Sequence, residues 1–74
     1  MDDKKLEAIS RKIRIRRLIL GYSQEYMAQE LEISQNVYSK NERNIRNVPL
    51  ARVLQICEIL CISLAGLLED TEAF

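Results

Sequence analysis

Apolar residues in this chain recur with the period of α-helices, and no strong alternation of apolar and polar residues is present. The apolar positions from about residue 7 to residue 20 predict a first helix that ends at Gly21, after a frayed start over residues 1–6. The same pattern predicts four further helices, at about residues 24–31, 35–42, 49–60 and 64–70. The fourth has apolar side chains over a wide arc, so we expect it to be central to the core.

The residue types at the predicted helix ends agree with these bounds. Ser23, Ser34 and Ser63 stand where a hydroxyl can accept a hydrogen bond from the unpartnered amides of a first helical turn. Pro49 is expected in the first turn of the fourth helix, where its missing N–H costs nothing. Asn44 is expected to end the third helix in the left-handed conformation.

Length and composition favour a single small all-α domain. The 74 residues are 47% hydrophobic, with two glycines and one proline, which disfavours a turn-rich β fold. We divide the chain into an N-terminal arm or start of the first helix at 1–8, a domain at 9–68, and a short acidic tail at 69–74.

The net charge of zero hides an uneven distribution along the chain. Residues 11–20 carry five positive charges and no negative one, whereas residues 21–34 and the end of the chain are acidic. A neutral total therefore does not exclude a polyanionic partner, because a positive face can coexist with an acidic tail. The five cations are Arg11, Lys12, Arg14, Arg16 and Arg17. We expect the first four mainly on a solvated face, with contact to a polyanionic partner as the alternative.

The chain offers little chemistry for a cofactor, a metal or catalysis. Cys57 and Cys61 lie four residues apart on one predicted helix and are expected to be small buried apolar side chains. Histidine is absent and there is no second cysteine pair, so we expect no metal site and no cofactor. No glycine-rich phosphate loop or nucleophile–base cluster suggests an enzyme. Free thiols, and no visible signal peptide or membrane span, predict a cytoplasmic protein.

A longer pattern carries a family resemblance. The stretch "RKIRIRRLILGYSQEYMAQELEISQNVYSKNER", followed by "PLARVLQICEILCISLAGLL", resembles the Xre/Cro-type helix-turn-helix family of phage repressors and bacterial regulators. The match runs from about Ile9 to Leu68, and its most specific pieces are "R-x3-GYSQEYMA", "LEIS" and "S-x7-ER", followed by "SLAGLL". The resemblance implies a compact five-helix lambda-repressor-like domain, with the helix-turn-helix at the second and third helices and double-stranded DNA as the partner.

The resemblance also implies which residues read DNA bases. In the family the third helix lies in the major groove with its N-terminal residues at base edges. The base-contacting positions are Gln35, Asn36, Ser39 and Lys40. The amides of Gln35 and Asn36 suit the adenine edge, whereas Lys40 could reach either a guanine or a phosphate. Without the family register, Gln35 and Asn36 would be ordinary exposed residues of a first helical turn.

Other positions are implied to approach the DNA backbone or to support the third helix. Gln24 matches a family glutamine that grips a phosphate together with the N-terminus of the second helix. Arg17 and Glu42 match a partly buried ion pair that ties the first helix to the end of the third. The remaining phosphate-contacting positions are Ser23, Arg43, Arg46 and Asn47, with a solvated surface charge as the alternative for each arginine.

Three residues depart from the family pattern. Glu32 replaces a glycine common in the turn, so the backbone there must either avoid positive φ or tolerate strain. Asn41 replaces a large apolar residue, so the third helix either packs less firmly or satisfies this amide on neighbouring backbone. Cys61 replaces a glycine that often ends the fourth helix.

These observations predict a sequence-specific DNA-binding transcriptional regulator that acts as a homodimer, because one recognition helix reads only a few base pairs. Leu67, Leu68 and Phe74 are the expected dimer contacts, and the alternative for Phe74 is a disordered terminus. The alternative function is an antitoxin that neutralises a toxin-like protein partner while repressing its own operon, although no toxin-wrapping segment is visible.

Overall fold

The longest helix of this computed structural model, which describes residues 2–69, is α1 (Asp3–Ile19). It begins four residues earlier than the sequence predicted, because the Asp2 carboxylate caps the helix by accepting a 2.8 Å hydrogen bond from the amide of Lys5. The frayed start expected for residues 1–6 is therefore wrong for residues 3–6. Gly21 follows the end of α1 with a φ of +76°, as expected of a residue that stops a helix.

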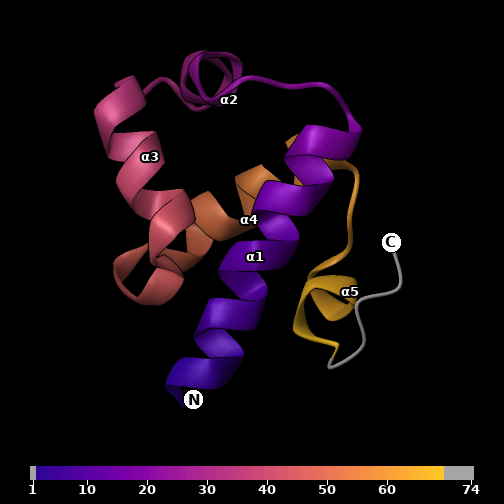
Figure 1. The fold of residues 1–74 in the computed structure, drawn as a ribbon. Coiled ribbons are helices and arrows are strands. Elements are labelled where there is room, and N and C mark those ends of the chain that lie inside the picture. The colour runs from indigo at the N-terminus through magenta and orange to yellow at the C-terminus, as the bar shows by residue number, and fades with distance from the viewer. Residues whose placement is uncertain (1, 70–74) are drawn as a thin grey trace.

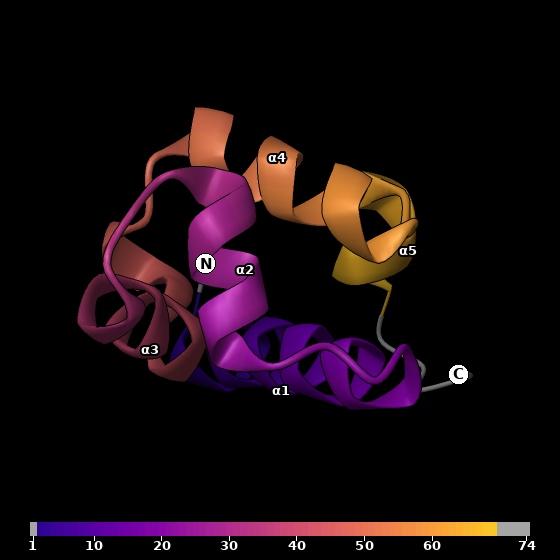
Figure 2. The same ribbon diagram turned by 90° about the horizontal axis from the view of Figure 1, so that it is seen from above.

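Four further α-helices and one 3₁₀ helix complete the fold, and α1 lies along one edge of the molecule with the other helices on one side of it (Figures 1 and 2). The part of the chain that the structure describes is helical and contains no strand. The elements after α1 are α2 (Gln24–Leu31), α3 (Gln35–Arg43), η1 (Ile45–Asn47), α4 (Leu50–Leu60) and α5 (Leu64–Leu68). Within residues 2–69 no helix combines the length and the apolar character needed to cross a membrane.

The three serine caps are confirmed. Ser23, Ser34 and Ser63 each accept a hydrogen bond of 2.9–3.1 Å from the amide three residues ahead. Asn44 differs from the expectation, because its backbone is extended, with φ −147° and ψ 105°, rather than left-handed. Its side chain accepts a 3.0 Å hydrogen bond from the amide of Arg46, so it opens η1, an element that the sequence did not predict.

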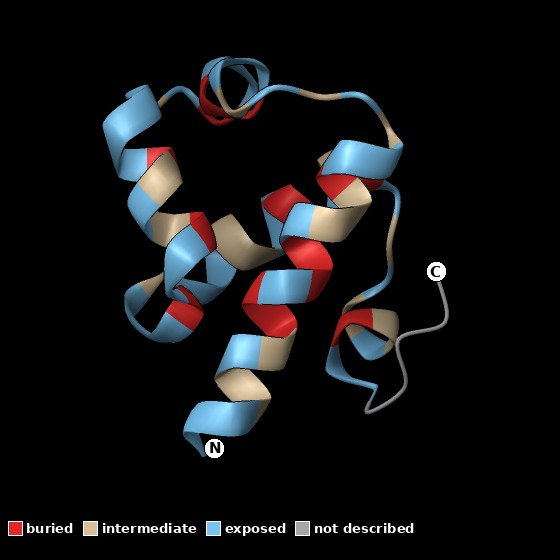
Figure 3. Cartoon of the chain, viewed as in Figure 1, coloured by how far each residue is buried: buried red, intermediate tan, exposed pale blue. Residues whose placement is uncertain are grey.

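The core lies between α1 and the helices around it (Figure 3). Its buried apolar members are Ile9, Ile13, Met27, Ala28, Leu31, Tyr38, Ile45, Ile56, Cys57, Leu60 and Leu67. Helix α4 contributes a narrower face than predicted, since Leu50 is 64% exposed and Leu54 42% exposed. Cys61 is also exposed, which corrects the expectation that both cysteines are buried.

Two cations of α1 satisfy carbonyl groups at the ends of other helices. Lys12 is only 1% exposed, and its ammonium group donates a hydrogen bond to the carbonyl of Glu69, just after α5. Arg16 donates from Nε to the carbonyl of Leu60 at 2.8 Å and from Nη2 to that of Cys61 at 3.4 Å. The last carbonyls of a helix lack partners within it and attract cations, so Lys12 and Arg16 are structural rather than solvated charges.

Candidate nucleic-acid interface

Helices α2 and α3 pack against each other and are joined by a turn of three residues, Glu32 to Ser34. Glu32 adopts the left-handed conformation, with φ 57° and ψ 41°, and the next amide, that of Ile33, donates to the carbonyl of Ala28 at 3.0 Å. The turn thus has the geometry for which glycine is usual, built with a glutamate. Figure 1 shows α2 end-on and α3 from the side, so the two axes cross steeply.

The outer face of α3 carries polar and basic side chains, whereas its inner face is buried. Tyr38 and Glu42 point inwards and are 0% and 5% exposed. Of the four predicted base-contacting residues, Gln35, Asn36 and Lys40 are exposed and Ser39 is partly buried. All four lie along one side of the helix, because positions separated by four residues share a face. The surface exists where the sequence predicted it, and its contact with bases stays a prediction.

A hydrogen-bond network around Glu42 holds the inner face of α3. Arg17 donates from Nε to Oε2 of Glu42 at 2.8 Å and from Nη2 to Oε1 at 3.1 Å, so the expected ion pair is present and bidentate. A third donor of Arg17, Nη1, reaches the carbonyl of Tyr22 at 2.8 Å. Tyr38 donates its phenol hydrogen to Oε2 of Glu42 at 2.6 Å, and Gln24 donates to Oε1 at 3.4 Å. Glu42 therefore links α1, α2 and α3.

The network sets the protonation states of its members. Burial alone would raise the pKa of the Glu42 carboxyl, but the hydrogen bonds from Arg17 and Tyr38 outweigh burial and lower it. The hydrogen bond to Glu42 raises the pKa of the Arg17 guanidinium, so this group is also held in its charged form. Burial, followed by the bond to Glu42, raises the pKa of the Tyr38 phenol, which keeps its proton and stays a donor. The pair is thus fully charged at neutral pH.

The predicted phosphate-contacting residues differ in how many of their hydrogen-bonding groups are already used within the protein. Gln24 uses one amide hydrogen for Glu42, which leaves the second for an external acceptor. Ser23 already accepts the capping bond from the amide of Tyr26, and its hydroxyl hydrogen remains to donate. Arg46 forms an exposed ion pair with Asp3 at the start of α1. Asn47 is exposed at the end of η1, and Arg43 is exposed at the end of α3.

Contacts that the sequence did not reveal also position α3 and η1. Ser10 on α1 is buried and accepts a 3.2 Å hydrogen bond from the amide of Ile45, the first residue of η1. Its spacing of seven residues from Arg17 places both on one face of α1, which is the signal that could have identified it. The pairing of Arg46 with Asp3 joins the same two elements and had no comparable signal.

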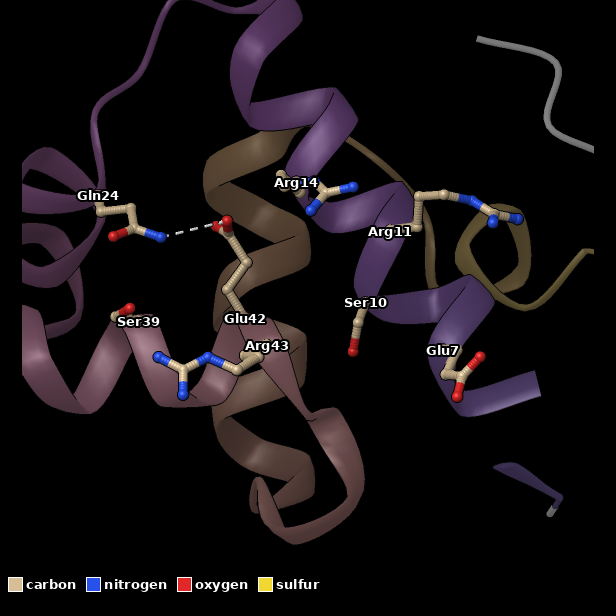
Figure 4. A pocket seen from close by; sticks show the side chains of 8 residues that line it. All are labelled: Glu7, Ser10, Arg11, Arg14, Gln24, Ser39, Glu42 and Arg43. Carbon is tan, nitrogen blue, oxygen red and sulfur yellow. Dashed lines mark hydrogen bonds between the residues drawn. The ribbon is translucent and has the colours of Figure 1, made fainter. Parts of the chain in front are cut away.

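A groove lies between α1 and α3 (Figure 4). Side chains of α1 form one wall and those of α3 the other, with Gln24 at the N-terminus of α2 at one end. The lining residues are Glu7, Ser10, Arg11, Arg14, Gln24, Ser39, Glu42 and Arg43. Ser39 and Arg43 belong both to this groove and to the outer part of α3, so the groove is continuous with the predicted DNA-reading surface.

Residues 2–69 contain no group of three histidine, cysteine or acidic side chains that could hold a metal ion.

A family model described as helix-turn-helix matches residues 13–67, most of the chain and all of α2 and α3. The chain belongs to the helix-turn-helix family, in its Cro/C1-type branch. It is therefore a DNA-binding protein of a family of transcription regulators. No curated protein and no solved structure matched the chain.

The three departures from the helix-turn-helix pattern have clear structural outcomes. Glu32 adopts the left-handed conformation usual for the glycine that it replaces, and Cys61 adopts it at the end of α4, with a φ of 54°. Asn41 is satisfied by a side chain rather than by neighbouring backbone, which was one of the two alternatives: Nη1 of Arg52 on α4 donates to its amide oxygen at 3.1 Å. The third helix of this helix-turn-helix protein is therefore held to α4 by a polar contact in place of an apolar one.

The expected dimer contacts do not all lie on the surface of the helix-turn-helix domain. Leu67 is 1% exposed and belongs to the core, because α5 packs against α1 and α4 with this side chain inwards. The prediction that Leu67 is an exposed dimer contact is therefore wrong. Leu68 is 36% exposed and accessible, and Phe74 lies outside the described residues.

Proposed function

We propose that this helix-turn-helix protein is a sequence-specific transcriptional regulator that reads the DNA major groove with α3. The observation that carries the proposal is the division of α3 into two faces. Tyr38 and Glu42 are buried and hydrogen-bonded to fixed groups, while the outer face presents amides and a lysine to solvent, together with the partly buried hydroxyl of Ser39. A rigid helix with an adaptable polar outer face is what direct readout of base edges requires.

Within this proposal the first turn of α3 reads bases and its surroundings hold phosphates. Gln35 and Asn36 each combine a donor and an acceptor that suit N6 and N7 of adenine. Ser39 and Lys40 lie one turn further along the same side. The backbone of the DNA is held by residues that flank this surface at the start of α2, the end of α3 and η1: Ser23, Gln24, Arg43, Arg46 and Asn47.

The Arg17–Glu42 pair supports the reading surface without touching DNA bases. It connects the second half of α1 to the last turn of α3 through two hydrogen bonds, and Gln24 joins the same carboxylate from α2. A fixed angle between α3 and the other helices would let phosphate contacts on α2 set the register of base contacts on α3.

We further propose that the protein binds as a homodimer on two half-sites, since a single recognition helix reads too few base pairs for useful affinity. Helices α3 and α5 lie on opposite sides of the molecule in both ribbon views (Figures 1 and 2). A contact through Leu68 and its surroundings on α5 would therefore leave α3 open to DNA.

Selection of bound duplexes from a random pool tests the function directly. Enrichment of one palindromic motif would support both sequence-specific reading and two half-sites. Enrichment of no motif would contradict sequence-specific reading. Sedimentation at micromolar concentration, with and without the selected duplex, then tests self-association, and a monomer under both conditions would contradict the homodimer.

A further inference from the structure

The groove between α1 and α3 contains two arginines that the fold itself does not use. The other five arginines of residues 2–69 each interact with another residue. Arg14 and Arg43 have none among the described residues, and both are exposed. They stand on opposite walls, Arg14 on α1 and Arg43 on α3 (Figure 4).

The register of α1 directs Arg14 towards α3. Ser10, four residues earlier, accepts a hydrogen bond from η1, and Arg17, three residues later, is bonded to Glu42 on α3. Residues three and four apart in a helix share a face, so Arg14 lies on the same side, between two anchored neighbours. Its position is thus set by the packing of α1, although its own side chain has no role in that packing.

The charge of the groove favours an anion. Three of its lining residues are arginines and two are carboxylates, Glu7 and Glu42. The carboxylate of Glu42 is already neutralised by Arg17, which is not among the lining residues. A positive excess therefore remains, with the hydroxyl of Ser39 and the free amide hydrogen of Gln24 as further donors.

We propose that this groove is a phosphodiester-binding subsite in which Arg14 and Arg43 hold one stretch of the DNA backbone between α1 and α3. This inference rests on the proposed function, and it adds α1 to the DNA interface. Guanidinium groups suit a phosphate because their planar donors can bind two oxygens at once. Gln24 at one end of the groove would meet the same strand, so that the backbone runs from the start of α2 to Arg14.

A salt titration of DNA binding tests the subsite. On both a selected duplex and a scrambled duplex, R14A should weaken binding and flatten the plot of log affinity against log salt by about one unit, because one phosphate contact is lost. R14K should keep the slope near that of the wild type while losing some affinity, since it keeps the charge without the planar fork. K4A is the matched control, because Lys4 is an exposed cation of α1 outside the groove.

The outcomes separate this inference from the proposed function. If R14A and K4A change the slope equally, Arg14 acts only through net charge and the subsite is wrong, while specific binding by the wild type would still stand. If the wild type binds no duplex, the proposed function fails first. Thermal melting of each variant checks the fold, and R14Q replaces R14A in the comparison if R14A melts early.

A second arm distinguishes the DNA backbone from a free anion. Inorganic phosphate is titrated into the protein at constant ionic strength, while the Nε–H signals of Arg14 and Arg43 are followed by NMR. We expect no saturation at micromolar phosphate and no displacement of bound duplex beyond that caused by chloride. Saturable binding that displaces the duplex would overturn the assignment to the DNA backbone and point to a small phosphate-bearing ligand.

Discussion

Tyr38 donates its phenol hydrogen to Oε2 of Glu42, one turn further along the same helix, at 2.6 Å. The same oxygen accepts from Nε of Arg17 at 2.8 Å, so a buried phenol and a guanidinium share one carboxylate oxygen. The tyrosine is therefore part of the core and part of the polar network at once. It orients the carboxylate that links α3 to α1, while its ring contributes to the apolar packing beneath α3.

Replacing Tyr38 with phenylalanine should therefore keep the packing and remove one hydrogen bond. We expect the free energy of unfolding to fall by about 1 kcal/mol, because the oxygen of Glu42 keeps Arg17 as a donor and is not left unsatisfied. Urea denaturation measures the effect. A double-mutant cycle with Glu42→Gln isolates the coupling, and additive losses would show that the phenol and the carboxylate do not interact.

Removing either partner of the Arg17–Glu42 pair should be more damaging. Arg17→Ala or Glu42→Ala should destabilise the fold by roughly 1–3 kcal/mol, since the remaining charge is left partly buried and unpaired. The matched control is Asp3→Ala, which breaks the exposed pair with Arg46 and should cost less than about 1 kcal/mol. Equal losses for the buried and the exposed pair would contradict the role assigned to Glu42.

The lowered pKa of Glu42 predicts a specific pH dependence. Its pKa in the folded protein lies below that of an unfolded glutamate, so the unfolded chain binds the proton first as the pH falls. The stability due to Glu42 is thus present above about pH 4.5 and is lost as the pH falls through the folded pKa.

Denaturation at a series of pH values should show a smaller loss of stability on acidification for Glu42→Gln than for the wild type. Glu58→Gln, on the exposed face of α4, is the control and should follow the wild type. Identical curves for all three proteins would mean that Glu42 does not contribute to the acid sensitivity.

Glycine at the two left-handed positions should stabilise the fold. Glu32 and Cys61 have φ values of 57° and 54°, where a side chain costs about 1 kcal/mol or more. Glu32→Gly and Cys61→Gly should therefore each raise the free energy of unfolding, by about 0.5–1 kcal/mol after the greater entropy of an unfolded glycine is deducted. The control is Glu30→Gly within α2, which should lower the free energy of unfolding by about 1 kcal/mol. A loss of stability at all three positions would show that the turns carry no strain.

Base reading and backbone holding should be separable in binding experiments. Gln35→Ala or Asn36→Ala should cost about 1–3 kcal/mol on the preferred duplex if the amide makes a bidentate base contact. On scrambled DNA the cost should be small and the salt slope unchanged, because neither amide displaces a counterion. The same titration with Arg43→Ala should weaken binding to both duplexes and flatten the slope. Full retention of preference by Gln35→Ala and Asn36→Ala would mean that α3 is not the reader.

Much of the fold was predictable from local pattern. The bounds of α2, the N-cap serines and the stop at Gly21 follow from residues within a few positions of one another, because the first and last turns of a helix are satisfied locally. The sequence-based predictions failed where contacts with residues distant in the sequence decide whether a side chain is buried or exposed. Nothing near Lys12 in the sequence indicates that the carbonyl of Glu69 will meet it, and Leu67 is inward only because α5 turns back onto α1.

The sequence by itself determined the helical class, the family register and the residues that form the outer face of α3, since these depend on periodicity and on motif spacing. The tertiary structure decided which charges are used by the fold and which remain free. Nothing in the local sequence distinguishes Arg14 from Arg16, yet Arg16 donates to carbonyls at the end of α4, whereas Arg14 lines the groove between α1 and α3. The reason is geometric: a two-residue step along a helix turns a side chain to the opposite side, and only the packing of α1 shows what each side meets.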